Sequence, residues 1–170
     1  MKKNFLLGNL LILLGIVCAF GAMFFPFANG IKLVSGGSSQ EMGRAYDYIF
    51  GVNSTGFLNP GTASIGIAKA AWILILIGAI FAILVVPLAF VTKKLPHFGH
   101  FTFGQVLGAF AALLLIVGGI LYFFVGGAYA TYYGLDKANV GLGIGFILSA
   151  IAGILGGVFC LLPLFVTLKK

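Results

Sequence analysis

The sequence predicts an all-α integral membrane protein, a four-helix transmembrane bundle of up-down-up-down topology formed by one domain, residues 1–170. Hydrophobic residues make up 61% of the chain and charged residues 8%, whereas soluble domains average about 45–50% and about 25%. The chain contains several apolar runs, each long enough to cross the roughly 30 Å hydrocarbon core of a bilayer. The last run also carries a small residue at every fourth position, which favours close helix packing in lipid.

The first predicted span, TM1, covers about residues 5–28. Lys2 and Lys3 precede it, as basic residues precede the apolar part of a signal peptide. The apolar run continues past Cys18 to Pro26, which gives it the length of a membrane span. We therefore expect an uncleaved helix that stays in the membrane.

The first outer loop is predicted at residues 29–65, with a short amphipathic helix from about Ser39 to Phe50. Ser38-x-x-Glu41 has the spacing of a capping box. Apolar residues then recur at helical intervals up to Gly51, a typical C-terminal stop. This helix is expected to lie on the membrane surface or to cap the bundle. Its polar side supplies the candidate partner-docking residues: Glu41, Arg44 and Asp47.

The remaining elements follow from the same apolar pattern. We expect TM2 at about 67–91, a cytoplasmic turn at 92–102, TM3 at about 103–125, an outer loop at 126–139 and TM4 at about 140–166. Trp72 near the start of TM2 suits the head-group level of a bilayer. Tyr129, Tyr132 and Tyr133 form a second aromatic cluster at the outer interface.

The distribution of charge predicts the orientation. One side carries only basic residues and the other carries both signs: Lys2, Lys3, Lys93, Lys94, Lys169 and Lys170 against Lys32, Arg44, Lys69, Lys137, Glu41, Asp47 and Asp136. The positive-inside rule places both termini and the 92–102 turn in the cytoplasm of a multi-pass cell-membrane protein. The net charge of +7 thus lies at the ends of apolar runs, which argues against a nucleic-acid partner.

Small residues predict where the helices pack. On TM4 they form a ridge with the spacing of a glycine zipper, which consists of Gly141, Gly145, Ser149, Gly153 and Gly157. TM3 carries a shorter ridge of small residues: Gly104, Gly108 and Ala112. Such ridges let two helix backbones approach closely. TM4 is expected to pack either on TM3 of its own chain or on a second copy.

No catalytic, cofactor-binding or metal site is predicted. Active transport and intramembrane catalysis usually need an ionisable residue at membrane depth, and the apolar runs lack one there. His97 and His100 have no third ligand nearby in the sequence. The glycine run from Gly141 to Gly145 lacks the Lys-Ser/Thr of a phosphate-binding loop.

The predicted span order resembles that of tetraspan membrane proteins of the claudin type. The tryptophan-bearing motif and disulfide pair of the claudin first loop are absent, because this loop has neither Trp nor Cys. We expect a non-enzymatic, tetraspan-like structural or assembly subunit of a membrane complex, whose partners are the lipid bilayer and another protein or a second copy. The alternative is a small transporter or channel component, with a pathway at an oligomer axis lined by glycine backbone and Ser149.

Overall fold

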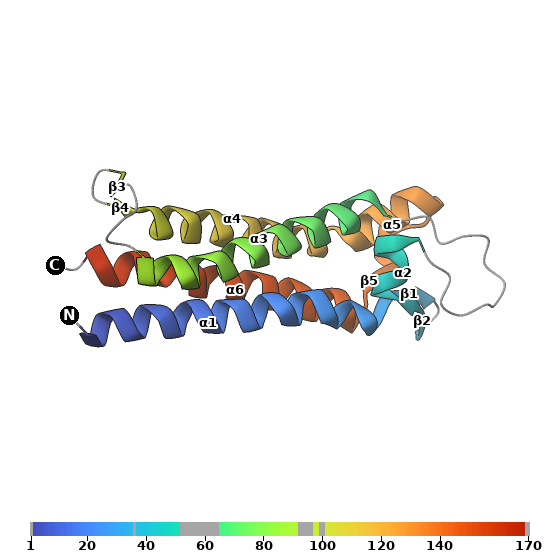
Figure 1. Cartoon of the computed structure of the whole chain (residues 1–170). Coiled ribbons are helices and arrows are strands. Elements are labelled where there is room, and N and C mark those ends of the chain that lie inside the picture. The colour runs from blue at the N-terminus through green and yellow to red at the C-terminus, as the bar shows by residue number, and fades with distance from the viewer. Residues whose placement is uncertain (1, 36, 52–64, 92–96, 99–100, 169–170) are drawn as a thin grey trace.

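A computed structural model describes residues 2–35, 37–51, 65–91, 97–98 and 101–168. Within these ranges, four helices are long and apolar enough to cross a membrane. They are α1 (Lys2–Phe24), α3 (Gly66–Val91), α4 (Phe103–Phe123) and α6 (Ile144–Leu168). The helices lie side by side as an elongated bundle, and both chain ends lie at the same end of it (Figure 1).

Each long helix packs against two others, in the order α1, α3, α4, α6 and back to α1. Contact between α1 and α3 is the least extensive of these four. The core between the helices contains mostly small side chains, including Ala71, Ala111, Ala112 and Ala150. Small side chains keep neighbouring axes close, so backbone and side-chain atoms of adjacent helices are in direct contact.

Two adjacent glycines place α4 between its neighbours. A β carbon at Gly118 would lie 2.9 Å from the carbonyl oxygen of Ala71 on α3. A β carbon at Gly119 would lie 2.7 Å from the carbonyl oxygen of Ala150 on α6. Because atoms do not approach so closely without a shift, larger residues here would push α3 and α6 away from α4.

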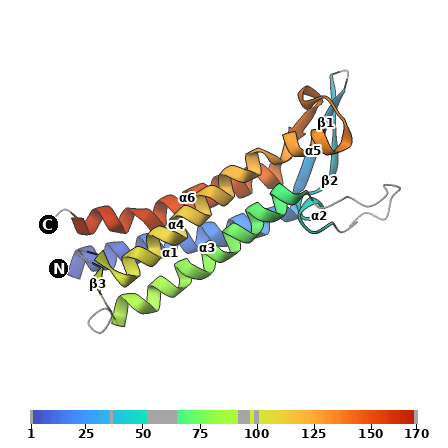
Figure 2. The same cartoon turned by 90° about the horizontal axis from the view of Figure 1, so that it is seen from above.

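A compact cap covers the end of the bundle opposite the chain ends (Figure 1). We use "cap" for residues 25–35, 37–51 and 125–143, which contain η1 (Phe25–Phe27), β1 (Asn29–Ser35), β2 (Ser38–Arg44), α2 (Ala45–Phe50), α5 (Val125–Tyr133), η3 (Lys137–Asn139) and β5 (Val140–Leu142). The hairpin of β1 and β2 projects beyond the helices (Figure 2).

The strands of the cap form an antiparallel sheet in the order β2-β1-β5. Ile31 of the central strand pairs with Met42 on one side and with Leu142 on the other. Ser35 pairs with Ser38 across the tight hairpin, where Gly37 adopts a left-handed φ of +83°. Glycine takes this conformation without steric cost, which suits it to a short turn.

At the other end, β3 (His97–Phe98) and β4 (Phe101–Thr102) form a short antiparallel pair before α4. Thr102 then caps α4: its Oγ1 accepts from the Gln105 N–H at 3.4 Å, and its own N–H donates to Gln105 Oε1 at 2.9 Å. Residues 92–96 and 99–100 of the predicted cytoplasmic turn, and 52–64 of the predicted outer loop, lie outside the described residues.

The predicted amphipathic helix from Ser39 to Phe50 is wrong in its first half. Ser38–Arg44 forms strand β2, and helix α2 begins only at Ala45. The reason is a partner distant in sequence, since β1 offers a full antiparallel ladder to this segment. The capping interaction also moves, because Arg44 and Asp47 close the first turn of α2 instead of Ser38 and Glu41.

The predicted start of the last span also needs correction. Gly141 lies in β5 opposite Lys32, so it is not part of the small-residue ridge of α6, which begins at Ile144. Pairing with β1 holds residues 140–142 extended and delays the helix. In addition, residues 125–133 form helix α5, so most of the segment expected as the second outer loop is helical.

Candidate functional site

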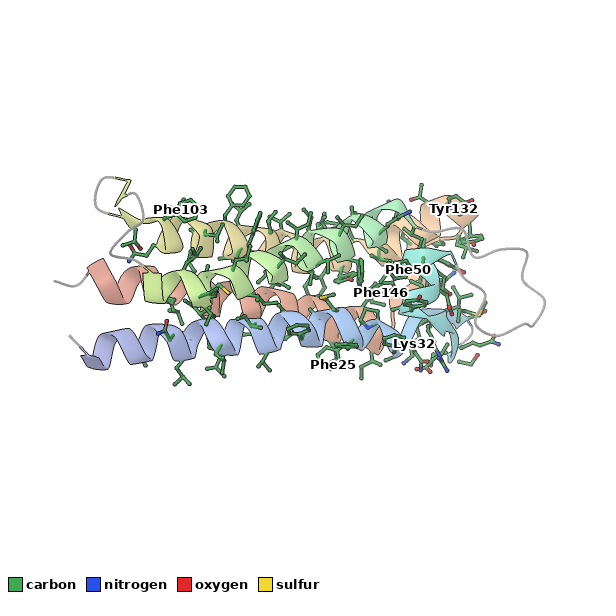
Figure 3. All side chains as sticks on the ribbon, in the orientation of Figure 1. Phe25, Lys32, Phe50, Phe103, Tyr132 and Phe146 are labelled. Carbon is green, nitrogen blue, oxygen red and sulfur yellow. The ribbon has the colours of Figure 1, made fainter. Side chains whose placement is uncertain are left out.

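Tyr48 lies at the centre of the cap and joins several of its elements. Its hydroxyl donates a hydrogen bond of 2.6 Å to the carbonyl oxygen of Met42 in β2. Its ring meets the Tyr129 ring of α5 edge-on, with centroids 5.5 Å apart, and lies 6.4 Å from the ring of Phe146. Phe146, from α6, is situated where the bundle meets the cap (Figure 3). The cap and the bundle therefore share one aromatic core.

Burial also changes the acidity of these phenols. The pKa of Tyr48 is raised well above its usual value, first by burial and then by the neighbouring Tyr129, Tyr133 and Asp47. The pKa of Tyr129 is raised by burial and by Tyr133, although a hydrogen bond with Tyr48 acts in the opposite direction. A tyrosine hydroxyl is neutral at physiological pH, and the raised pKa keeps both phenols protonated to a higher pH than an exposed tyrosine.

Glycines allow the backbone around the start of β1 to cross the backbone around the start of α6. A β carbon at Gly143 would overlap the carbonyl oxygen of Asn29, and one at Gly145 would lie 2.8 Å from that of Ala28. The Gly143 N–H donates to the Gly30 carbonyl oxygen at 2.7 Å. The Gly-x-Gly-x-Gly run of residues 141–145 thus fits a chain crossing, and the structure gives it a packing role.

The predicted packing residues of α6 meet α4 or the cap of the same chain. Ser149 is fully buried, and its hydroxyl donates to the Gly145 carbonyl oxygen at 2.7 Å. A β carbon at Gly153 would lie 3.2 Å from the Cα of Gly119, and one at Gly157 would lie 2.6 Å from the Ala112 carbonyl oxygen. Gly108 is further away, at 3.6 Å from the Cys160 carbonyl oxygen, and Gly104 is buried.

A second close contact, between α1 and α6, was missed by sequence reasoning. A β carbon at Gly15 would lie 3.0 Å from the Gly156 carbonyl oxygen, and one at Gly156 would lie 3.1 Å from that of Gly15. The signal in the sequence is the pair of four-residue spacings Gly15-x-x-x-Ala19 and Ala152-x-x-x-Gly156. Helix α6 therefore contacts α4 through one small-residue face and α1 through another.

The three candidate docking residues do not lie on one surface. Glu41 is exposed on β2, opposite Lys32, and accepts a hydrogen bond from the Asn29 side-chain amide. Arg44 is exposed at the junction of β2 and α2. Asp47 is only 2% exposed, and its Oδ2 accepts from the Arg44 backbone N–H at 2.9 Å. The expectation that Asp47 faces a partner is therefore wrong, because this carboxylate is buried at the start of α2.

Among the described residues, no group of three or more His, Cys, Asp and Glu side chains is placed to hold a metal ion. No protein-family model matches this chain, and no curated protein is significantly similar to it.

Proposed function

We propose that this chain is a four-span cell-membrane protein with up-down-up-down topology, and that it serves as a non-enzymatic structural or assembly subunit of a membrane complex. Both chain ends would lie in the cytoplasm and the cap outside. The charge pattern supports this orientation, because the chain-end side of the bundle has lysines without acids. The cap side carries Glu41, Asp47 and Asp136 as well as basic residues.

The observation that carries the proposal is where the small-residue faces are used. Gly15, Gly118, Gly119, Gly153 and Gly157 all approach backbone atoms of neighbouring helices in the same chain. Since close helix contacts of this kind are made internally, the outer helix surfaces keep long apolar side chains suited to lipid. A specific protein partner is then best recognised at the polar surface of the cap.

Within the cap we place this docking surface on strand β2. The sheet order β2-β1-β5 leaves one edge of β2 without a paired strand among the described residues. Glu41 and Arg44 are exposed along this strand and carry opposite charges. Backbone groups at a strand edge, flanked by fixed charges, can pair with an extended segment of another protein and select among such segments.

The test is charge reversal on the tagged full-length protein. Glu41→Lys combined with Arg44→Glu keeps the net charge and should reduce co-purification of a stoichiometric membrane partner after cross-linking in the native membrane. Asp136→Lys combined with Lys137→Glu, in the other exposed segment of the cap, is the matched control and should leave the partner bound. Equal partner recovery from both variants would argue against docking at β2.

The alternative, a transporter or channel component, predicts flux through an oligomer-axis pathway lined by glycine backbone and Ser149. Ser149 is fully buried, and Gly153 and Gly157 approach α4. Such a pathway would therefore need other lining residues. Uptake of ions and small solutes by liposomes that contain the purified protein distinguishes the two functions, because a structural subunit leaves the flux at the level of empty liposomes.

A further inference from the structure

A continuous row of aromatic rings crosses the outside of the molecule from α1 to α3. We call Phe24, Phe27, Tyr46, Phe50 and Trp72 the aromatic row. Successive ring centroids along it are 6.4, 5.3, 4.6 and 4.9 Å apart. These residues come from α1, η1, α2 and α3. The row therefore bridges the two neighbouring long helices whose direct contact is the least extensive.

The aromatic row is exposed, although it lies where the cap joins the ends of α1 and α3. Phe24 and Phe27 are 62% and 53% exposed, Phe50 is also exposed, and Tyr46 and Trp72 are half-buried. The opposite face of α2 is buried in the cap through Ala45, Tyr48 and Ile49. In water, the outer face of such a helix would carry polar side chains, so exposed rings here indicate an apolar or interfacial contact.

The position of the row indicates what covers it. Leu13, Val17, Phe20 and Phe24 form an exposed apolar stripe along α1, and the row continues this stripe at its cap end. At the other end, exposed Lys69 precedes Trp72 by one helical turn. Phe50 of the row and Tyr132 of α5 both lie at the cap end of the bundle (Figure 3), so aromatic side chains of two separate helices occur at this end.

We propose that the aromatic row binds lipid at the head-group level of the outer leaflet, so that α2 rests on the membrane plane. This inference rests on the proposed function, since it needs the bundle to span a bilayer. Aromatic rings with a polar tip, such as Tyr46 and Trp72, favour the membrane interface over both water and the hydrocarbon core. The Lys69 ammonium can reach lipid phosphates from the same face.

Trp72 provides the test, because it is the one tryptophan of the chain. The full-length protein is reconstituted in phosphatidylcholine vesicles, and its fluorescence is measured with three quenchers. These are lipids brominated close to the head group, lipids brominated near the end of the acyl chain, and aqueous iodide. The expected result is stronger quenching by the shallow bromines than by the deep bromines, with little quenching by iodide.

A pair of variants tests whether the neighbouring ring matters. Phe50→Ala removes the ring 4.9 Å from Trp72 and should shift the tryptophan emission to longer wavelength and increase quenching by iodide. Phe110→Ala removes an equally large exposed ring from α4, far from the row in sequence, and should leave both measurements unchanged. An identical response of the two variants would contradict the role of the row.

The remaining outcomes separate this inference from the proposed function. Dominant quenching by iodide would place the row in water, and dominant quenching by the deep bromines would place it in the hydrocarbon core; either result overturns the inference. Protection from all three quenchers, in protein that resists alkaline extraction from the vesicles, would mean that a second copy covers the row, and this result would also overturn the inference. Release of the protein by alkaline extraction would instead refute the membrane-spanning proposal itself.

Discussion

At the scale of single residues, Tyr48 does more than fill the cap. Its hydrogen bond reaches β2, its ring packs on α5, and it approaches Phe146 of α6. Helices α5 and α6 are distant from α2 in sequence, so their association with it depends on contacts of this kind. Loss of the hydroxyl should therefore weaken the cap without changing the shape of its core.

We predict that Tyr48→Phe lowers the stability of the cap by about 1 kcal/mol at neutral pH, the usual net contribution of one hydrogen bond. The measurement is thermal unfolding of the protein in detergent, followed by near-ultraviolet circular dichroism. Tyr132→Phe is the control, because Tyr132 is exposed and its hydroxyl lies outside the core. A loss of the same size in both variants would contradict a special role for the Tyr48 hydroxyl.

The raised pKa of Tyr48 also predicts a pH dependence. A phenol whose folded-state pKa is raised favours the folded state while the pH is below the unfolded value, about 10. This contribution is lost as the pH rises towards the folded value, so the wild-type cap should lose stability above about pH 10. Tyr48→Phe cannot ionise there and should show a shallower decline. Parallel curves for the two proteins would contradict the assignment.

At the scale of elements, α6 is held through small residues on two faces. Gly153 and Gly157 approach α4, and Gly156 approaches α1. Large side chains on either face would separate the helices, because several of the atoms that these side chains would meet belong to the backbone of the neighbouring helix. The bundle should therefore respond much more strongly to added bulk on these faces than at glycines with free space around them.

Gly153→Leu should destabilise the bundle by about 1–3 kcal/mol or more, the usual cost of overpacking a core, and lower its melting temperature in detergent. A β carbon there already meets Gly119 and Leu115 at 3.2 Å. Gly127→Leu on α5 is the matched control, since a β carbon at that position meets no described atom within 4 Å. Unchanged melting and oligomeric state in Gly153→Leu would refute the packing.

The contact of α1 with α6 can be tested by cross-linking. A β carbon at Gly15 would lie 2.6 Å from the Cys160 Sγ, so Gly15→Cys should form a disulfide with Cys160 under a mild oxidant. Cys18→Ala in the same chain removes the other thiol, and a protease site inserted between α2 and α3 separates the two cysteines. The cleaved halves should stay linked until a reductant is added. Separation of the halves without reductant would contradict the helix order.

The sequence predicted the long apolar helices well because their signal is local and strong. Each apolar run carries its own evidence of length and composition, and no distant partner is needed to recognise it. The cap was harder, because β2 becomes a strand only through pairing with β1, and Gly141 is extended only through β5 pairing with the same strand. The Gly36-Gly37 pair between Ser35 and Ser38 was the local hairpin signal that sequence reasoning overlooked.

The candidate docking residues show the same dependence on tertiary pairing, over a short stretch of the chain. Glu41, Arg44 and Asp47 have helical spacing, yet they occupy a strand, a junction and a buried helix start. Polar character alone did not distinguish Asp47, which caps α2, from Glu41, which is exposed. That distinction depends on where α2 begins, and element boundaries are set by tertiary pairing here.

At the scale of the whole molecule, the two ends of the bundle differ in chemistry. One end holds the three-stranded sheet, helices α2 and α5 and every acidic residue of the chain, and the other holds the chain ends (Figure 1). A bundle with such different ends should insert in one orientation, because basic residues without acids resist translocation across the membrane. Orientation is therefore a property of the whole chain that can be measured directly.

We predict that single cysteines at Ser39 and Lys94 are labelled from opposite sides of the membrane. Ser39 is exposed on β2 of the cap, whereas Lys94 belongs to the basic cluster between the second and third spans. In a chain with Cys18→Ala and Cys160→Ala, a membrane-impermeant maleimide added to intact cells should label Ser39→Cys, and Lys94→Cys should react only after permeabilisation. Labelling of both positions in intact cells would refute the topology. Replacing Lys2, Lys3, Lys93 and Lys94 by glutamine should then produce mixed labelling, because fewer positive charges would favour the proposed cytoplasmic position of this end.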